Sequence, residues 1–543
     1  MQKTCKSCTH PFEIPQEDLD FYKRISPTFA GKTFQVPPPN LCPPCRQQLR
    51  MSFRNERKLY SRPSSLSDKT IVATHAPDKP WPVYDQEEWW SDSWNELEYS
   101  QDFDFNKTLA EQFQELYTKV PHISLVNTNT ENSYYTNFAL NQKNCYLIFG
   151  AGDNEDCLYG KYVVSCKDCT DILSTVNCEL CYESIGSEKC YNCRYLKNCR
   201  ACNDCTMIED CTGCKNCIAC FGLRFKEHCY LNKQYSPEEF KRIAQAHHEL
   251  THEKIIELKT QLTNLKKDLP HIWAHIYASE DCSGDLVSHC KNTKHSFNAT
   301  NCEDCKYLAF TPNTQNSHDC TYNAPIGPEY SYNMNSTAQL KDCMCNFLVW
   351  YGNDIRYSIE CHHSSNLFAC TGMRHKQYCI LNKQYSKEDY EILVARIIEH
   401  MITTGEWGEY HNKSTSPYAY NETIAQEYFP LTREEALKKG WTWKDEPPQE
   451  PQPQNPQQGT LVCKKSNRQF RLTPQEVIFY KRMGLPTPDL HHDERHDARM
   501  SEFNPLNLWT RQCSKCQAKI ETNYSPNRPE TIYCEKCYLA EVY

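Results

Sequence analysis

The chain has 543 residues, of which 39% are hydrophobic, and its mean hydropathy is −0.76, which disfavours one large globular core. No run of eighteen apolar residues occurs, and the start MQKTCKSCTH lacks the apolar segment of a secretory signal, so we expect a cytoplasmic protein without a membrane segment. Thiols stay reduced in the cytoplasm, and the 35 cysteines are therefore expected to be metal ligands or buried thiols. The net charge of −9 is unevenly spread, because residues 1–62 are basic and residues 85–115 are strongly acidic.

Residues 1–62 contain two C-x2-C pairs, which together supply the four thiolates that zinc takes in structural sites. This segment is predicted to be a zinc ribbon with the ligands Cys5, Cys8, Cys42 and Cys45; the alternative is two unrelated pairs. Four arginines follow at helical spacing: Arg46, Arg50, Arg54 and Arg57. They form a candidate nucleic-acid-binding face, or else a solvated helix face packed on the ribbon.

Residues 63–119 are predicted to be a degenerate second ribbon followed by an acidic, aromatic connector. Comparison with the C-terminus places Ser64, Ser67, Asp85 and Glu88 at its ligand positions, where the other copy has cysteines. We do not expect a firm metal site there.

Residues 120–235 repeat every twelve residues, which predicts a β-solenoid. One column contains Cys145, Cys157, Cys169, Cys181, Cys193, Cys205, Cys217 and Cys229. Columns three before, three after and six after it hold cysteine, small or apolar residues, so we expect four inward residues per coil. Asn or Asp precedes the first column in most coils and is expected at tight left-handed corners.

The inward cysteines allow three interpretations. They could be buried fillers, which we favour because Ile, Val, Ala and Leu share their columns. They could be disulfides between neighbouring coils. They could also be metal ligands, in which case the candidates are Cys166, Cys169, Cys178, Cys181, Cys190, Cys193, Cys202, Cys205, Cys214 and Cys217.

Residues 236–269 are predicted to form a connector helix over about 237–268, which starts at the S-x-x-E cap of Ser236 and Glu239. Within it His248, Glu249 and His252 match H-E-x-x-H, the signature of zinc metallopeptidases. The alternative is an amphipathic helix that carries two histidines, and no third ligand is recognisable downstream.

Residues 270–385 are predicted to form a second, less regular cysteine-rich solenoid, whose stretch 306–342 bulges out as a longer coil or loop. A helix over about 387–402 opens the segment 386–446, and residues 447–458 are a Pro/Gln linker. Residues 459–543 repeat the N-terminal ribbon pair. Their first ribbon has Cys463, Ser466, His491 and Glu494 at the ligand positions, and their second is an intact zinc site of Cys513, Cys516, Cys534 and Cys537.

The motifs CPPCRQQLR, YDQEEWWSDSW, NCYLIFGAGDNEDCLYG, LNKQYS and YCEKCYL together resemble a family of uncharacterised cysteine-rich zinc-ribbon proteins from candidate-phyla (ultra-small) bacteria. The resemblance covers nearly the whole chain and implies a bacterial cytoplasmic protein, without implying an activity. The chain departs from the expected ligands at Ser64, Ser67, Ser466, His491 and Glu494.

We therefore expect a mainly β protein with two cysteine-lined β-solenoids, connecting helices and terminal zinc ribbons. The predicted function is that of a non-enzymatic zinc-binding scaffold, which binds a macromolecule, nucleic acid among the candidates, through its ribbons. One alternative is a metal or redox store that uses the solenoid cysteines. The other is a zincin-type metallopeptidase centred on residues 248–252.

Overall fold

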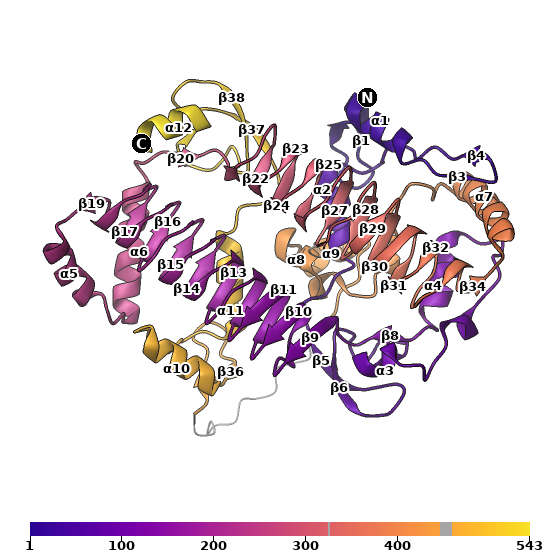
Figure 1. The fold of residues 1–543 in the computed structure, drawn as a ribbon, viewed down its shortest axis with the longest axis horizontal. Helices are drawn as coiled ribbons and strands as arrows, with labels where there is room; N and C mark the ends of the chain where they lie inside the picture. Colours follow the sequence, from indigo (N-terminus) through magenta and orange to yellow (C-terminus); the bar gives the residue numbers. More distant parts are fainter. Residues whose placement is uncertain (324–325, 446–458, 543) are drawn as a thin grey trace. The chain divides into compact units, whose positions relative to one another are not determined.

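The computed structural model describes residues 1–323, 326–445 and 459–542, and it divides into two compact units (Figure 1). The first unit comprises Met1–Leu125 and His275–Asp445, and the second comprises Val126–Ala274 and Glu446–Tyr543. The N-terminal ribbons thus belong with the second solenoid, whereas the C-terminal ribbons belong with the first. The predicted linker 447–458 lies outside the described residues.

The solenoid of the second unit confirms the predicted fold. Its strands are β9 (Asn127–Glu131), β10 (Asn137–Lys143), β11 (Tyr146–Glu155), β12 (Leu158–Val164), β13 (Thr170–Val176), β14 (Glu179–Ile185), β15 (Tyr191–Lys197), β16 (Thr206–Glu209), β17 (Lys215–Phe221) and β18 (Glu227–Tyr230). Neighbouring strands are parallel and pair at a shift of twelve residues, as Cys181 does with Cys193 and Cys217 with Cys229. Short β19 (Lys233–Gln234) closes the stack antiparallel to β18.

The coil turns a corner at every third residue. In one coil, the backbone is left-handed at Asn192, Tyr195, Asn198 and Ala201, with φ between 50° and 59°. The predicted left-handed Asn and Asp corners are confirmed, for example at Asn144 and Asp156. The other corners carry tyrosine, leucine or alanine, residues in which this conformation costs about 1–2 kcal/mol. The ladder and the core must therefore hold these corners in place.

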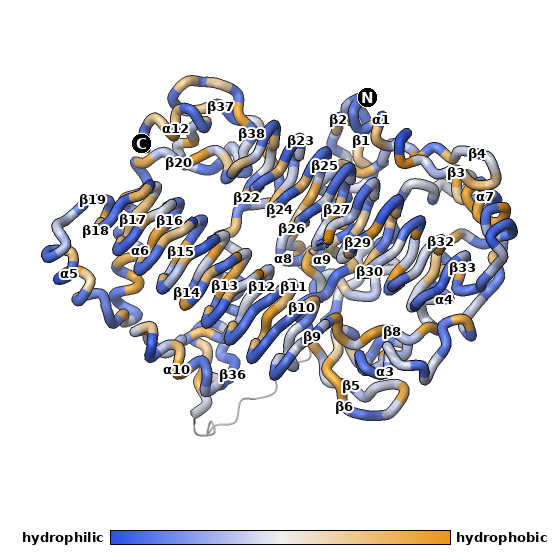
Figure 2. The backbone as a smooth tube through the Cα atoms, in the orientation of Figure 1, coloured by the Kyte–Doolittle hydropathy of each residue, from blue (hydrophilic) through white to orange (hydrophobic). Residues whose placement is uncertain are grey.

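The inward residue follows each corner, so one residue in three enters the core. This buried core consists of cysteines and of apolar residues such as Ile148, Val163, Ile172 and Leu196. Figure 2 shows polar and apolar residues changing at short intervals along the solenoid strands. Among the described residues, no helix has the length and apolar character needed to cross a membrane.

The solenoid of the first unit has more strands, and most of them, apart from β30, are short. They are β21 (Ile276–Tyr277), β22 (Gly284–Ser288), β23 (Lys291–Lys294), β24 (Ser296–Thr300), β25 (Glu303–Lys306), β26 (Ala309–Pro312), β27 (His318–Thr321), β28 (Tyr332–Asn335), β29 (Ala338–Lys341), β30 (Met344–Arg356), β31 (Ile359–His362), β32 (Ser365–Phe368), β33 (Gln377–Ile380) and β34 (Lys383–Gln384). The bulge predicted over the whole of 306–342 is wrong, because β27, β28 and β29 stay in the stack, but one coil within it is longer. The register lengthens only from twelve residues (Lys306 with His318) to fourteen (His318 with Tyr332).

A helix follows the last strand of each solenoid. Ser236 and Glu239 form the predicted capping box of α5 (Pro237–Ala246), and α7 (Lys387–Thr404) ends at Gly405, whose φ is 78°. The continuous helix predicted over 237–268 is wrong. It breaks after α5, and α6 (His252–Lys266) starts anew with Thr251 as its N-cap.

The ribbons of the first unit are built from short hairpins and helices. The first ribbon contains β1 (Gln2–Thr4), β2 (Pro11–Glu13), α1 (Gln16–Arg24), β3 (Thr28–Phe29), β4 (Lys32–Thr33) and α2 (Pro43–Met51). The second contains β5 (Tyr60–Pro63), β6 (Thr70–Ala73), β7 (Val83–Tyr84) and α3 (Gln86–Trp90), and is followed by η1 (Glu96–Tyr99), α4 (Leu109–Tyr117) and β8 (His122–Ile123). The segment after α7 adds η2 (Lys413–Thr415), η3 (Tyr420–Glu422), α8 (Ile424–Tyr428) and α9 (Arg433–Lys438).

The second unit repeats this arrangement. Its ribbons contain β35 (Leu461–Val462), β36 (Gln469–Phe470), α10 (Pro474–Arg482), α11 (His492–Glu502), β37 (Trp509–Gln512), β38 (Lys519–Thr522), β39 (Ile532–Tyr533) and α12 (Glu535–Val542). In both units a ribbon strand pairs in parallel with a P-H-I segment: β7 with β8, and β39 with β20 (His271–Ile272). The two units are thus built on the same plan.

Candidate metal centres and ribbon docking

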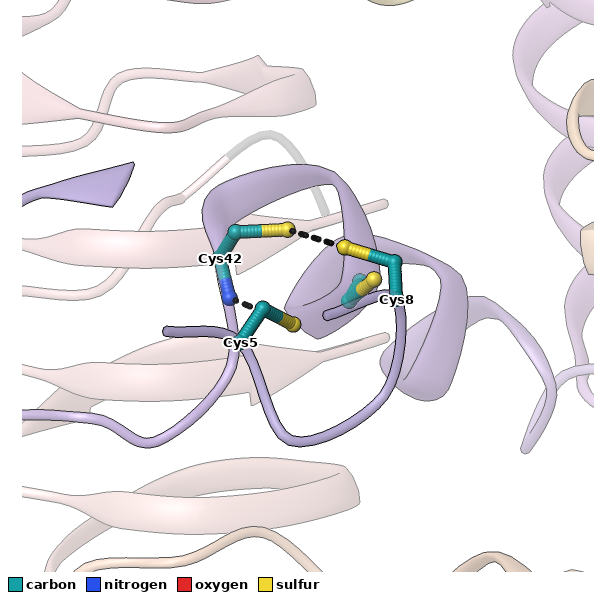
Figure 3. A group of neighbouring side chains, drawn as sticks. Cys5, Cys8 and Cys42 are labelled. Atoms are coloured by element: carbon teal, nitrogen blue, oxygen red, sulfur yellow. Dashed lines mark hydrogen bonds between the residues drawn. The ribbon is translucent and has the colours of Figure 1, made fainter. Parts of the chain in front are cut away.

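The N-terminal cysteines form a compact group that could hold a metal ion. The sulfur atoms of Cys5, Cys8, Cys42 and Cys45 all lie within 4.8 Å of one another. The Cys8 and Cys42 sulfurs are 3.7 Å apart, and the backbone N–H of Cys42 donates to the Cys5 sulfur at 3.3 Å. Figure 3 shows both contacts as dashed lines. A hydrogen bond from Cys45 lowers the pKa of Cys42 to about 5, and the same contact raises the pKa of Cys45, so the first thiolate of this pair forms at Cys42. Four clustered thiolates suit soft or borderline metals such as zinc.

The second predicted cluster has the same geometry. The sulfurs of Cys513, Cys516, Cys534 and Cys537 lie within 4.8 Å of one another, and those of Cys516 and Cys534 are 3.7 Å apart. Burial raises the pKa of Cys513, but backbone N–H groups of the knuckle outweigh it and lower that pKa to about 6. Both four-cysteine sites predicted from the sequence are therefore assembled in the structure.

In the second ribbon of the first unit, hydrogen-bonded side chains occupy the positions where zinc ligands were expected. The Ser64 hydroxyl donates to the Glu88 carboxylate, and the backbone N–H of Asp85 donates to the same carboxylate at 3.2 Å. Burial raises the pKa of Glu88, but hydrogen bonds from Ser64 and Ser67 outweigh it and lower that pKa below its usual value. A hydrogen-bonded carboxylate thus stands where the C-terminal copy has thiolates.

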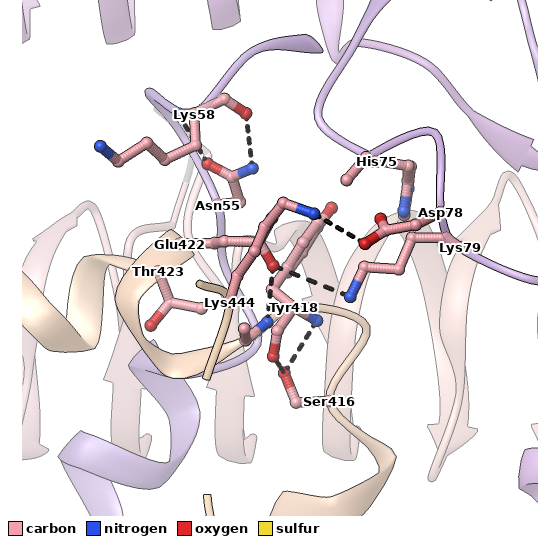
Figure 4. Close-up of polar contacts among 12 residues, drawn as sticks. Asn55, Lys58, His75, Asp78, Lys79, Ser416, Tyr418, Glu422, Thr423 and Lys444 are labelled. Carbon is pink, nitrogen blue, oxygen red and sulfur yellow. Dashed lines mark hydrogen bonds and ion pairs between the residues drawn. The ribbon is translucent and has the colours of Figure 1, made fainter. Parts of the chain in front are cut away.

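Ion pairs to the segment after α7 also hold this degenerate ribbon (Figure 4). The Lys444 ammonium lies 2.8 Å from the Asp78 carboxylate, and Lys79 lies 3.7 Å from Glu422. The hydrogen bond from Lys444 lowers the pKa of Asp78. Polar contacts to a neighbouring segment therefore help to fix a ribbon that lacks the four-cysteine set.

The degenerate ribbon of the second unit has also lost its closed ligand set. The Nδ1 atom of His491 accepts the backbone N–H of Asp493 at 3.2 Å, and Glu494 pairs with Lys465 at 2.7 Å. Cys463 is buried but belongs to no candidate metal group among the described residues. Instead His491, His492 and Asp493 form a small group that could hold a metal ion. The sequence reasoning missed this group, which the adjacent H-H-D letters could have indicated.

Three of the four arginines predicted to bind nucleic acid, Arg46, Arg50 and Arg54, are buried, and Arg57 is partly buried. Arg46 and Arg50 pair with the two carboxylate oxygens of Asp319 at 2.9 and 3.0 Å, and the three side chains are at most 5% exposed. Farther along, Arg54 pairs with Glu56 at 2.6 Å and Arg57 lies 3.9 Å from Glu427. The predicted nucleic-acid-binding face is therefore wrong, because three of these arginines are buried and all four lie against carboxylates of the first unit.

The second unit uses the same contact. Arg495 and Arg499 pair with Asp171 at 2.6 and 2.9 Å, and all three side chains are nearly fully buried. A solenoid tyrosine also lies under the first arginine in each unit: Tyr159 under Arg495 at 4.8 Å, and Tyr307 under Arg46 at 5.1 Å. Sequence reasoning missed both aspartates. The sequence does contain a pattern that could have indicated them, because each aspartate lies one coil, or twelve residues, after the tyrosine that its arginine contacts.

The solenoid cysteines are free thiols with regular hydrogen bonds. All 35 cysteines lie in the described residues, and none forms a disulfide. Cys193 donates to the carbonyls of Tyr191 and Cys202 at 3.1 and 3.5 Å, and its sulfur accepts the N–H of Cys205 at 3.4 Å. The hydroxyl of Ser187 forms the same kind of contacts, which explains why serine also occupies these columns.

The structure does not gather the solenoid cysteines into metal groups. Among the described residues, the groups that could hold a metal ion include no solenoid cysteine. This applies to all ten candidates: Cys166, Cys169, Cys178, Cys181, Cys190, Cys193, Cys202, Cys205, Cys214 and Cys217. The geometry supports the interpretation of these cysteines as buried fillers of the core. Their thiols also form hydrogen bonds with the backbone of the coils.

Replacing Cys193 by alanine is expected to lower the free energy of unfolding by about 1–3 kcal/mol, because it leaves the Cys205 N–H buried without an acceptor. Cys193→Ser should cost less, since a hydroxyl can accept and donate as Ser187 does. Denaturant melts of both variants would measure the difference. Equal losses for serine and alanine would contradict the hydrogen-bonding role.

The H-E-x-x-H segment does not form the single helix that a zincin requires. His248 lies in the break after α5, whereas His252 is the first residue of α6. The Nε2 atom of His252 lies 3.0 Å from the carbonyl of Thr487, and the backbone of Gly484 packs against His248. Neither histidine belongs to a candidate metal group among the described residues. The predicted metal site on one helical face is therefore wrong.

Comparisons with known proteins add little. No protein-family model matches the chain, and no curated protein matches it. A similar solved structure is that of a putative acetyltransferase from Desulfovibrio desulfuricans G20, at 8% identity over 49% of this chain and 70% of that one. Its TM-score is 0.11, which supports no conclusion about fold or function.

Proposed function

We propose that the protein is a non-enzymatic scaffold whose two four-cysteine clusters bind zinc, and that its ribbons bind a macromolecular partner. The clusters carry this proposal, because four thiolates from paired C-x2-C knuckles complete the tetrahedral set of structural zinc. A closed set leaves no position for a substrate. The free thiols fit a cytoplasmic protein, as the family resemblance also implies.

The exposed C-terminal knuckle is the candidate contact surface. Cys516 is exposed, and the nearby side chains of Lys519 and Lys536 are exposed as well. Nucleic acid is one partner class that such lysines could contact, in place of the buried arginines of the N-terminal ribbon. A protein partner is the other.

Metal analysis of the natively purified protein tests the first part of the proposal. We expect two zinc ions per chain, one for each four-cysteine cluster. Five or more would favour the alternative of a metal store in the solenoid, whereas a third ion could also bind at His491, His492 and Asp493. A protein that contains no zinc would contradict the zinc-scaffold proposal.

Anisotropy titration with labelled single-stranded DNA and RNA tests the second part. Binding should weaken as the salt concentration rises. The double substitution Lys519→Glu plus Lys536→Glu should weaken it by about tenfold if two phosphate contacts are lost. Lys241→Glu plus Arg242→Glu, an exposed pair on α5, is the charge-matched control. Failure to bind at low salt would exclude nucleic acid as the partner.

A further inference from the structure

The first unit contains a cavity of about 870 Å³ beside the N-terminal cysteine cluster. Its wall includes Lys6 and Cys45 of the ribbon, Phe113 of α4, and His411 and Trp441 from the segment that follows α7. This volume lies within the range of sites for small molecules and cofactors. The docking residues Arg46, Arg50 and Asp319 do not line it.

One part of the wall is aromatic. Trp441 is 9% exposed and its ring lies 5.1 Å from that of Tyr420, while Phe113 lies 5.1 Å from the His411 ring. Leu49 and Met401 extend this surface. Such a wall suits a flat ring.

A buried imidazole adds a specific polar group. His411 is 8% exposed, and its Nε2 atom has no hydrogen-bond partner among the described residues. Burial lowers the pKa of His411 to about 4, so the ring is neutral at pH 7. A neutral imidazole has one donor and one acceptor, and a buried polar atom without a partner is rare in native proteins.

The wall carries four lysines and three glutamates, so positive side chains are in slight excess. The cavity's carboxylates have partners: Glu406 accepts the backbone N–H groups of Leu109 and Ala110 at 3.0 and 2.9 Å, and Glu409 accepts from Asn40. Glu435 accepts from Thr432, the residue that caps α9. By contrast, the ammonium groups of Lys6 and Lys438 make no hydrogen bond or ion pair with any residue that the structure describes.

We propose that this cavity binds a nucleoside phosphate, whose base contacts the aromatic wall and His411 and whose phosphate contacts Lys6 and Lys438. The ligand could be a free mononucleotide or the 5′-phosphorylated end of a strand, because both present the same ring and anion. This site goes beyond the scaffold function, since it requires no macromolecule and lies apart in sequence from the C-terminal knuckle.

Isothermal titration of the full-length, zinc-loaded protein with AMP and ADP tests the proposal, with adenosine and inorganic phosphate as partial ligands. Both nucleotides should bind more tightly than either partial ligand. Lys6→Glu plus Lys438→Glu should weaken binding at least about tenfold, through loss of two charge-assisted contacts. His411→Phe, which keeps a ring but removes Nε2, should also weaken it.

Lys23→Glu plus Arg24→Glu on α1 is the charge-matched control in the same unit and should leave nucleotide affinity unchanged. Lys519→Glu plus Lys536→Glu should do the same, which separates this site from the proposed knuckle surface. A 5′-phosphorylated tetranucleotide that binds more tightly than AMP would assign the site to strand ends, and equal or weaker binding would assign it to free nucleotides. No nucleotide binding at about 1 mM, the weak end of the affinity scale, would overturn the proposal. Binding unaffected by the Lys6 and Lys438 change would overturn it as well.

Discussion

Replacing Asp319 by alanine is expected to lower the free energy of unfolding by about 3–5 kcal/mol, the cost of leaving buried charges without their partner. Asp319 is fully buried and pairs with both Arg46 and Arg50, so its loss leaves two buried guanidinium groups without their carboxylate partner. Denaturant melts would measure the loss. Hydrogen exchange of residues 43–51 would show whether α2 detaches first.

An exposed ion pair in the same unit provides the control. Lys32 and Glu399 lie 2.6 Å apart but are 59% and 52% exposed, so Glu399→Ala should cost no more than about 1 kcal/mol. If Asp319→Ala costs no more than this control, the buried contact does not hold the ribbon.

The same contact has a pH dependence of known sign. Burial raises the pKa of Asp319, but the charges of Arg46 and Arg50 outweigh it, and its pKa in the folded protein is lowered. The stabilisation is therefore complete above the unfolded value of about 3.9 and is lost as pH falls through the lowered folded value.

Replacing Cys5 by serine is expected to abolish metal binding at the N-terminal cluster and to cost several kcal/mol, because metal binding at such sites contributes directly to folding. The cluster includes Cys42, the N-cap of α2, and Cys45 in its first turn, so loss of the metal should also loosen the arginines that follow. Metal content and thermal melts, with and without chelator, would measure both effects.

Cys463 is the matched control for this experiment. It occupies the same position in the repeated ribbon and is equally buried, but it lies outside any four-cysteine cluster. Cys463→Ser should therefore cost only about 1 kcal/mol and should not change the metal content. Similar losses for the two variants would argue against a metal at Cys5.

The repeating parts of this protein could be predicted from its sequence, because their signals are local. A cysteine every twelve residues indicates a stacked coil, and two C-x2-C pairs indicate a tetrathiolate site. The docking contacts could not be predicted in the same way. Arg50 and Asp319 are 269 residues apart, and nothing local shows that the arginines of α2 face a carboxylate rather than solvent.

Two further errors have local causes. The helix predicted through His248 ignored Thr251, whose side chain caps α6 and so favours a new start there. The bulge predicted over 306–342 assumed that lost cysteines mean a lost coil. Thr311, Ser317 and Ser331 continue the hydrogen bonds of the inward columns, so the stack persists without cysteine.

Each unit is divided between two distant stretches of chain, and this division sets the order in which the two units can be completed during synthesis. The ribosome makes Arg46 and Arg50 long before Asp319, a delay of roughly 15–55 s at about 5–20 residues per second. During that interval the two arginines of α2 lack their carboxylate partner. The first unit is complete once Asp445 has emerged, whereas the second, whose solenoid is made earlier, must wait for the C-terminal ribbons. A nascent chain therefore finishes its units in the reverse order of their solenoids, and a nonsense mutation after Asp445 would spare the first unit alone.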